Sequence, residues 1–326
     1  MSNVVEPDML AIDRASIRDA SVPGAATKSA LALILAGDHV YKMNYGAMLS
    51  DHIARGAQMS VACIDVSLDA ARALGVMTVD DQRRVVDFQE KPGEPASDPN
   101  RPGRALASMG IYMFDAPFLY AELLRDAHDA ESSHDFGRDI IPSLVRRGPA
   151  VYAHDFTQSC VNMSAGVPYW RDVGTIDAYW EANIALTDVV PELNLYDKDW
   201  PIWTYQEQLP PAKFVYNEPP RRGIATNSLV SGGCIISGST VHRSLLFSNV
   251  HVHSYCTIEE SVVLPNVDIA RNVVLKRAVV DKYCRLPPGL SVGVDLEQDR
   301  QRFHVTDSGI TLITPDMLGQ HVHHSR

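Results

Sequence analysis

The chain lacks the features that tie a protein to a membrane or to an oxidising compartment. No run of about 18 consecutive apolar residues occurs, and no positively charged stretch followed by an apolar one opens the sequence, so neither a membrane span nor a secretory signal is expected. The five cysteines are odd in number and widely spaced, without the short spacing that a zinc site or a redox motif needs. We therefore expect a cytoplasmic protein with reduced, buried cysteines.

Basic residues are also few relative to acidic ones. The 29 lysines and arginines face 40 aspartates and glutamates, which gives a net charge of −11. Nucleic-acid phosphates need a concentrated basic surface, and this composition does not supply one. The charge therefore argues against a nucleic-acid partner but leaves free nucleotides and sugar phosphates open, because a local basic site or a metal can bind them.

The first half of the chain alternates between strand-like and helix-like segments. With 326 residues and 45% hydrophobic content, the chain is long enough for two domains. Apolar runs at 31–35, 60–66 and 107–114 are typical of strands, and helical spacing follows the first run as far as Ile53. A capped helix is expected to start at Ser133 and to run toward Pro142. This alternation indicates an α/β sheet.

The second half has a different period. Six prolines interrupt the stretch 191–223, which we interpret as a linker. Beyond it aliphatic residues recur every five or six positions, at Val230, Ile236, Val241, Phe247, Val252, Ile258, Val263, Ile269, Val274, Val280, Leu286 and Val292. This period predicts a parallel β-helix with small residues such as Gly233 and Gly238 at its corners. A sandwich of short antiparallel strands is the alternative, but no Asn-Gly or Asp-Gly hairpin signal supports it.

Two acidic residues stand where an α/β sheet binds ligands. Asp38 directly follows the first apolar run, at the expected carboxyl end of a strand, where it could hold a metal. The alternative is that Asp38 caps the helix beginning near Asn44. Asp172 precedes a helical stretch that begins near Thr175 and could share one Mg²⁺ with Asp38, or could instead pair with Arg171.

The tripeptide Glu90-Lys91-Pro92 ends another segment that is expected to form a strand. A lysine can serve as a point charge for a phosphate, while a glutamate accepts hydrogen bonds from sugar hydroxyls, so the pair could hold a phosphorylated sugar. Taken alone, the same tripeptide is also a common surface turn.

Several longer segments resemble motifs of the sugar nucleotidyltransferases. Their particular residues resemble those of the bacterial ADP-glucose pyrophosphorylases (glucose-1-phosphate adenylyltransferases). They are LAGDHVY at 35–41, FQEKP at 88–92, LASMGIY at 106–112, SHDFG at 133–137, YWRDVGT at 169–175 and NSLVSGG at 227–233. The resemblance extends over about 31–318, which is too long for a chance match to a short motif.

This resemblance implies a fold class and a domain order. The fold is expected to be α/β, with a partial, Rossmann-like nucleotidyltransferase sheet domain over 30–190 and a left-handed parallel β-helix domain over 224–318. Residues 1–29 are an unmatched segment in this scheme, 191–223 the linker, and 319–326 a disordered tail whose His321, His323 and His324 could also bind a metal.

The resemblance also implies a reaction and its residues. A phosphate oxygen of glucose 1-phosphate would attack the α-phosphorus of ATP and release pyrophosphate, giving ADP-glucose for glycogen biosynthesis, with positioning and charge neutralisation as the main catalytic devices. The expected contacts to glucose 1-phosphate are Gly75, Glu90, Lys91 and Ser108, in a pocket lined by Tyr112, Asp135, Phe136 and Trp170. The expected Mg²⁺ ligands are Asp38 and Asp172, which with Lys91 would be the catalytic residues.

The sequence departs from the family at its beginning. Full-length members begin with a strand and a glycine-rich, arginine-bearing loop that holds the triphosphate, whereas the only glycine within 1–29 is Gly24. We therefore expect impaired or absent ATP binding, and association with itself or with a full-length homologue. The chain is then either an adenylyltransferase completed by a partner, or a non-catalytic regulatory or assembly subunit that binds sugar phosphates. Acyltransferases share such repeats, but the motifs outside the repeats oppose that interpretation.

Overall fold

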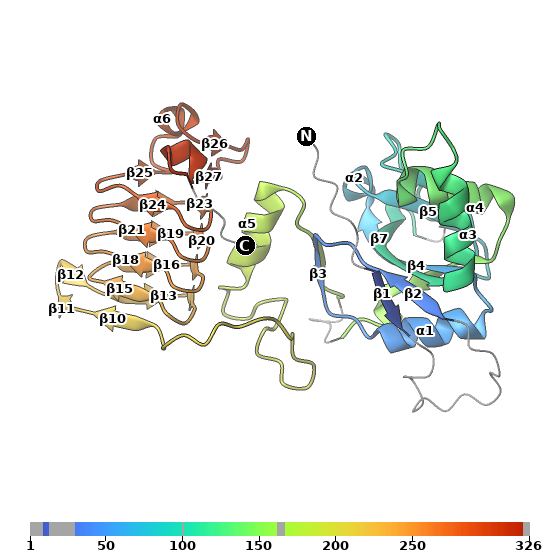
Figure 1. Ribbon diagram of the computed structural model, residues 1–326, viewed down its shortest axis with the longest axis horizontal. Coiled ribbons are helices and arrows are strands. Elements are labelled where there is room, and N and C mark those ends of the chain that lie inside the picture. The colour runs from blue at the N-terminus through green and yellow to red at the C-terminus, as the bar shows by residue number, and fades with distance from the viewer. Residues whose placement is uncertain (1–8, 13–29, 100, 162–166, 322–326) are drawn as a thin grey trace. The chain divides into compact units, whose positions relative to one another are not determined.

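The computed structural model describes residues 9–12, 30–99, 101–161 and 167–321. The expected segment 1–29 lies outside the described residues apart from 9–12, and so do His323 and His324 of the expected tail. The chain divides into two compact units, Met1–Trp170 and Arg171–Arg326, whose elements are shown in Figure 1. This division falls ahead of the boundary at residue 190 that the prolines indicate.

The first unit is built on a seven-stranded sheet. Its main path runs β1 (Met9–Ile12), β2 (Leu31–Ile34), β7 (Arg104–Asp115), β4 (Met59–Ser67) and β8 (Val151–Asp155), while β5 (Gly75–Val79) pairs with β7 and with β6 (Val85–Glu90). The β4–β8 pair is parallel, and β7 pairs antiparallel with β2, β4 and β5. The apolar runs expected as strands are thus β2, β4 and β7, and this part of the prediction is confirmed.

Helices cover both faces of the sheet. One face packs against α1 (Tyr45–Ala54) through Met48 and Leu49. The other face packs against α3 (Ala116–Ala127) and α4 (Ile141–Arg147). The remaining short elements are β3 (His39–Tyr41), α2 (Leu68–Ala71), and the single turns η2 (Phe136–Ile140) and η3 (Phe156–Gln158). Because strand neighbours alternate, each strand supplies side chains to both cores.

The helix expected from Ser133 starts differently. Asp135 caps η2 by accepting hydrogen bonds from the backbone N–H groups of Gly137 and Arg138, and η2 continues into α4 past Pro142 to Arg147. The hydroxyl of Ser133 instead donates to the Asp139 carboxylate at 2.6 Å. Pro142 does not end the helix because it lies in the first turn of α4, where its missing N–H is not needed.

The second unit contains the parallel β-helix. Three sheets form its faces, in the orders β10-β15-β18-β21-β24, β13-β16-β19-β22-β25 and β14-β17-β20-β23-β27-β26. The strands of the first face are β10 (Lys213–Val215), β15 (Ile235–Ser237), β18 (His251–Val252), β21 (Asp268–Ile269) and β24 (Arg285–Leu286). Those of the second are β13 (Ile224–Thr226), β16 (Thr240–His242), β19 (Thr257–Glu259), β22 (Val274–Lys276) and β25 (Ser291–Val292). Those of the third are β14 (Leu229–Val230), β17 (Leu245–Leu246), β20 (Val262–Val263), β23 (Ala278–Val280), β27 (Thr311–Ile313) and β26 (His304–Val305), of which β26 alone is antiparallel to its neighbour.

The stacked coils bury a column of aliphatic side chains. On the first face Ile236, Val252, Ile269 and Leu286 lie in register and are all buried. The predicted β-helix is therefore confirmed, but two predicted column positions are wrong. Leu246 is buried in place of Phe247, and Leu275 in place of Val274.

The corners of the coils use a left-handed backbone conformation. Gly233 and Gly238, which the sequence places at corners, have φ values of 77° and 63°. Asn249 and Asn266 take the same conformation one and two coils beyond Gly233, with φ of 61° and 62°. Glycine and asparagine adopt this conformation more easily than other residues, which explains their presence there.

The β-helix extends further toward the N-terminus than expected. Strand β10 lies inside the expected linker 191–223 and pairs in parallel with β15, and the two-residue strands β11 (Asn217–Glu218) and β12 (Arg221–Arg222) form a hairpin beside it. Strand β9 (Trp170–Asp172) falls at the division between the units, and α5 (Ile176–Ala185) follows with Thr175 as its N-cap. The C-terminal part adds α6 (Leu296–Arg300) and the turn η4 (Asp316–Leu318).

The cysteines and helices bear on two further expectations. All five cysteines are free thiols, and Cys160 is partly exposed while the other four are buried. Within the described ranges, every helix is too short or too polar to cross a membrane.

Candidate functional site

The candidate site is centred on Glu90, the last residue of β6. Strand register places Gly75 of β5 directly opposite Glu90. A Cβ atom on Gly75 would lie 2.9 Å from Oε2 of Glu90, and one on Gly137 would lie 2.5 Å from the same oxygen. A side chain at Gly137 would have to displace this carboxylate, and one at Gly75 would meet both the carboxylate and the Phe88 ring. The site therefore joins the end of β6 to the start of η2, two segments that are far apart in the sequence.

Hydroxyl and aromatic groups surround this carboxylate. The Tyr112 hydroxyl of β7 forms a hydrogen bond with the side chain of Ser108 and feels the charges of Glu90 and Asp135. Burial raises the pKa of Tyr112 to about 12, so its hydroxyl stays protonated and can donate a hydrogen bond. The ring of Phe136 lies 5.6 Å from that of Tyr112. These groups form a partly apolar wall with polar atoms at defined positions, as ligand pockets do.

Neighbouring groups shift the pKa of Glu90 in both directions. Burial raises the pKa of Glu90 above its ordinary value, and the Asp135 carboxylate raises it further, while Lys91 and Arg138 act in the opposite direction. Lys91 follows Glu90 with a left-handed backbone (φ 45°), and its N–H donates to the Leu74 carbonyl at 3.0 Å. The corner therefore offers two carboxylates as hydrogen-bond acceptors beside a lysine and an arginine. Such a set suits a ligand with hydroxyl groups and a phosphate.

The structure thus brings most of the predicted sugar-phosphate residues together. Gly75, Glu90, Lys91, Ser108, Tyr112, Asp135 and Phe136 surround one corner of the first unit. Trp170 does not join them. It is 8% exposed and packs in the core on the α1 side of the sheet, where its ring meets that of His39 at 5.0 Å. The roles of all these residues toward a ligand stay predictions.

Asp38 stands beside an irregularity of β7. Gly110 has φ of 66°, and a Cβ there would lie 2.9 Å from the His39 ring. This opening lets Nδ1 of His39 bond to the Met109 carbonyl at 2.7 Å, while Nε2 lies 3.5 Å from Oδ1 of Asp38. The Asp38 carboxylate is 58% exposed, so a ligand can reach it. Asn44, not Asp38, caps α1 by accepting the Gly46 N–H at 3.0 Å, which excludes the capping alternative for Asp38.

Asp172 belongs to the second unit. Its Oδ1 accepts the backbone N–H of Gly174 at 2.8 Å. Arg171 donates to Glu192 at 2.5 Å. The joint metal role of Asp38 and Asp172 stays a prediction.

Sequence reasoning missed three residues of this region. Gly137 ends the segment SHDFG, and its missing side chain makes room for Glu90. Arg138 lowers the pKa of Glu90, and Gly110 makes room for His39. Gly110 offered a signal, because a glycine inside an otherwise apolar strand often marks a close approach, whereas Gly137 stands among mostly polar residues and offered none.

Comparison with known proteins gives two family matches and close relatives. A nucleotidyl transferase family model matches residues 16–189, and a GlmU-like C-terminal hexapeptide model matches residues 210–313. These matches agree with the expected fold class, a nucleotidyltransferase sheet followed by a left-handed parallel β-helix.

Three curated relatives carry the same name. The glucose-1-phosphate adenylyltransferase of Nitrosospira multiformis is 62% identical over 294 residues, which are 90% of this chain and 69% of that protein. That of Methylobacillus flagellatus is 63% identical with the same coverage of both chains. That of Nitrosomonas europaea is 61% identical over 90% of this chain and 68% of its own length.

Proposed function

Because the chain belongs to the glucose-1-phosphate adenylyltransferase family, we propose that it binds glucose 1-phosphate at Glu90 and takes part in adenylyl transfer from ATP to that sugar phosphate. The observation that carries the proposal is the close approach of Glu90 to Gly75 and Gly137. It fixes a carboxylate beside Lys91 and Asp135, where sugar hydroxyls and a phosphate would find complementary groups.

Each group has a proposed role. Glu90 and Asp135 accept hydrogen bonds from the hydroxyls of glucose, and the Tyr112 and Ser108 hydroxyls complete that side of the pocket. Lys91 neutralises the phosphate. Held in this way, the attacking phosphate oxygen is restricted to one approach, which lowers the barrier of an in-line displacement without a covalent intermediate.

The family typically uses a divalent metal, and we propose that Asp38 and Asp172 hold Mg²⁺ here. Both supply carboxylate oxygens, the ligand type that Mg²⁺ takes, and Asp38 is exposed enough to be reached. When bound, Mg²⁺ supplies charge neutralisation on the triphosphate. The carboxylates themselves serve to orient it.

Pyrophosphate release tests the proposed reaction. The purified chain is incubated with ATP, glucose 1-phosphate and Mg²⁺, alone and together with the Nitrosospira multiformis relative. Release by the chain alone supports the transferase. If the chain alone releases nothing but alters the kinetics of the relative, the chain acts as a regulatory or assembly subunit instead.

Sugar-phosphate binding is tested separately, by calorimetry on a Gly137→Ala variant. The added methyl would meet the Glu90 carboxylate and displace it, so we expect glucose 1-phosphate binding to weaken between about tenfold and a hundredfold. Gly93→Ala is the matched control, because a Cβ there meets nothing within 4 Å. Equal affinities of the two variants would contradict the proposed site, whatever the result of the pyrophosphate assay.

A further inference from the structure

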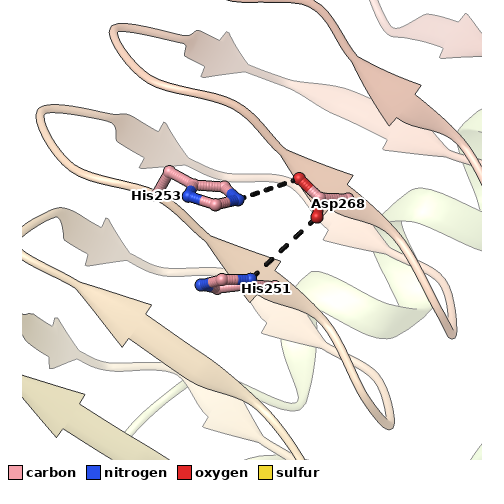
Figure 2. A group of neighbouring side chains, drawn as sticks. All are labelled: His251, His253 and Asp268. Atoms are coloured by element: carbon pink, nitrogen blue, oxygen red, sulfur yellow. Dashed lines mark ion pairs between the residues drawn. The ribbon is translucent and has the colours of Figure 1, made fainter.

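Three side chains on the first face of the β-helix lie in a metal-ligating arrangement that the proposed reaction does not use. Val252 points into the core with 0% exposure, so the flanking His251 and His253 both project from the outer surface. One coil later, Asp268 lies in register with His251. Figure 2 shows the two imidazoles stacked beside the Asp268 carboxylate.

The ligand atoms are close enough to share one ion. Nε2 of His253 lies 3.1 Å from Oδ1 of Asp268, and Nδ1 of His251 lies 4.0 Å from Oδ2. One ligand atom from each residue can be chosen so that all three lie within 4.8 Å of one another. A tetrahedral ion with bonds of about 2.0–2.2 Å separates its ligands by roughly 3.4 Å, so only small side-chain rotations are needed.

The backbone that carries these side chains is held on both sides. The N–H groups of His251 and His253 donate to the carbonyls of Val267 and Ile269 in the following coil, at 3.0 and 2.9 Å. The Asp268 N–H in turn donates to the Cys284 carbonyl at 3.0 Å. The backbone positions of the three ligands are therefore fixed before an ion binds, and binding would order only their side chains.

The two rings also face the carboxylate together. The stacked rings of His251 and His253, with centroids 4.0 Å apart, each present one nitrogen toward Asp268. His251 and Asp268 also border a surface hollow, lined as well by Asn249, Asn266 and Arg285, which leaves space for a further ligand.

We propose that His251, His253 and Asp268 bind one divalent transition-metal ion, of which Zn²⁺ is the best fit, with a fourth coordination position left open toward solvent. Two imidazoles and one carboxylate suit Zn²⁺, Co²⁺ or Ni²⁺ and disfavour Mg²⁺, which takes oxygen ligands. The site is therefore distinct in metal preference from the Mg²⁺ proposed for Asp38 and Asp172, and it does not depend on the proposed reaction. The ion would link two neighbouring coils of the β-helix.

The test measures Zn²⁺ bound to the full chain after dialysis against excess Mg²⁺. His321, His323 and His324 near the C-terminus could bind metal as well. A variant with these three changed to Ala is therefore compared with His251→Ala/His253→Ala. We expect the second variant alone to lose one equivalent of Zn²⁺. His242→Ala is the matched control, since His242 is an exposed histidine of the same β-helix that bonds to Thr226 instead.

Co²⁺ substitution provides a spectroscopic reading. Co²⁺ bound at this site should give visible ligand-field bands with the wild-type chain. The Asp268→Asn variant should bind Co²⁺ and Zn²⁺ about tenfold or more weakly. Its melting temperature without metal should equal that of the wild-type chain. The asparagine variant keeps the shape of the side chain, so it also serves if the double alanine variant fails to fold. Unchanged Zn²⁺ stoichiometry in the double variant, or unchanged Co²⁺ bands in Asp268→Asn, would show that Asp268 is only an ion-pair partner of the two histidines.

Discussion

At the scale of single residues, the candidate site depends on missing side chains as much as on charged ones. The sequence motifs predicted Glu90, Lys91 and Asp135 individually as ligand-binding residues. These motifs could not show that Glu90 fits between Gly75 and Gly137. The three residues lie on β5, β6 and η2, which come together only in the folded chain. The sequence therefore predicted the chemical groups of the corner but not the close packing that positions them.

The raised pKa of Glu90 gives a pH prediction. A carboxyl group whose folded-state pKa lies above its ordinary value of 4.5 binds a proton more tightly in the folded state. Its stabilising contribution is present below that ordinary value and is lost as pH rises through the folded-state pKa. Glu90→Gln removes this dependence, so without ligand the variant should be more stable than wild type at neutral pH, and this advantage should shrink as the pH falls.

Urea denaturation at a series of pH values checks this expectation, with Asp87→Asn as the control, since Asp87 is an exposed carboxylate on the same strand. The same Glu90→Gln variant should bind glucose 1-phosphate more weakly by about 1.5–3 kcal/mol, the usual value of a hydrogen bond to a charged group. A variant that gained stability and kept its affinity would show that the carboxylate is strained but not used.

At the scale of elements, the period of the aliphatic residues predicted the β-helix but not every inward position. The two errors occur where apolar residues are adjacent, at Leu246-Phe247 and at Val273-Val274-Leu275. A period of five or six cannot choose between neighbours within such a run. The choice is made by the strand register, which aligns Leu275 with Ile258 in the preceding coil and with Val292 in the following one.

This register predicts which of two adjacent residues matters for stability. Leu275→Ala should lower the free energy of unfolding by about 2–5 kcal/mol, because Leu275 is fully buried and its truncation leaves a cavity in the column. Val274→Ala should lower the free energy of unfolding by about 1 kcal/mol or less, because the Val274 side chain is only partly buried.

Denaturation followed by fluorescence measures both changes in chains whose other three tryptophans are replaced by phenylalanine, which leaves Trp180 as the reporter. Trp180 packs on the outside of the β-helix, with its indole N–H donating to the Glu260 carbonyl at 2.7 Å, so it reports on this unit. The reverse order of costs would mean that Val274 occupies the column, as the sequence period alone suggested.

At the scale of the whole molecule, length predicted two domains, and the structure divides into two units with separate cores. The sequence could not place the division, because α5 continues the helix-strand alternation of the first half. Its apolar residues Trp180 and Ile184 instead pack with Leu245 and Val262 of the β-helix unit. Only the tertiary contacts of α5 reveal to which unit it belongs.

Separate cores predict separate unfolding steps, and the cysteines can report them. Cys63 is buried in the first unit, where burial raises its pKa to about 12, while Cys234, Cys256 and Cys284 are buried in the β-helix. A buried thiol does not react with alkylating reagents until its surroundings open. After the partly exposed Cys160 has been blocked, pulsed alkylation in graded urea should label the three β-helix cysteines together and Cys63 at a different urea concentration.

Ligands should then move the two steps independently. A ligand stabilises only what it binds, so glucose 1-phosphate at a hundred times its dissociation constant should add about 2.7 kcal/mol to the opening of the unit around Cys63 and leave the β-helix cysteines unchanged. Zn²⁺ bound to His251, His253 and Asp268 should instead protect the β-helix cysteines and leave Cys63 unchanged, since these ligands lie in the β-helix unit. Protection of all four cysteines by either ligand would mean that the units unfold as one, and protection of the wrong set would contradict the assignment of that ligand to its unit.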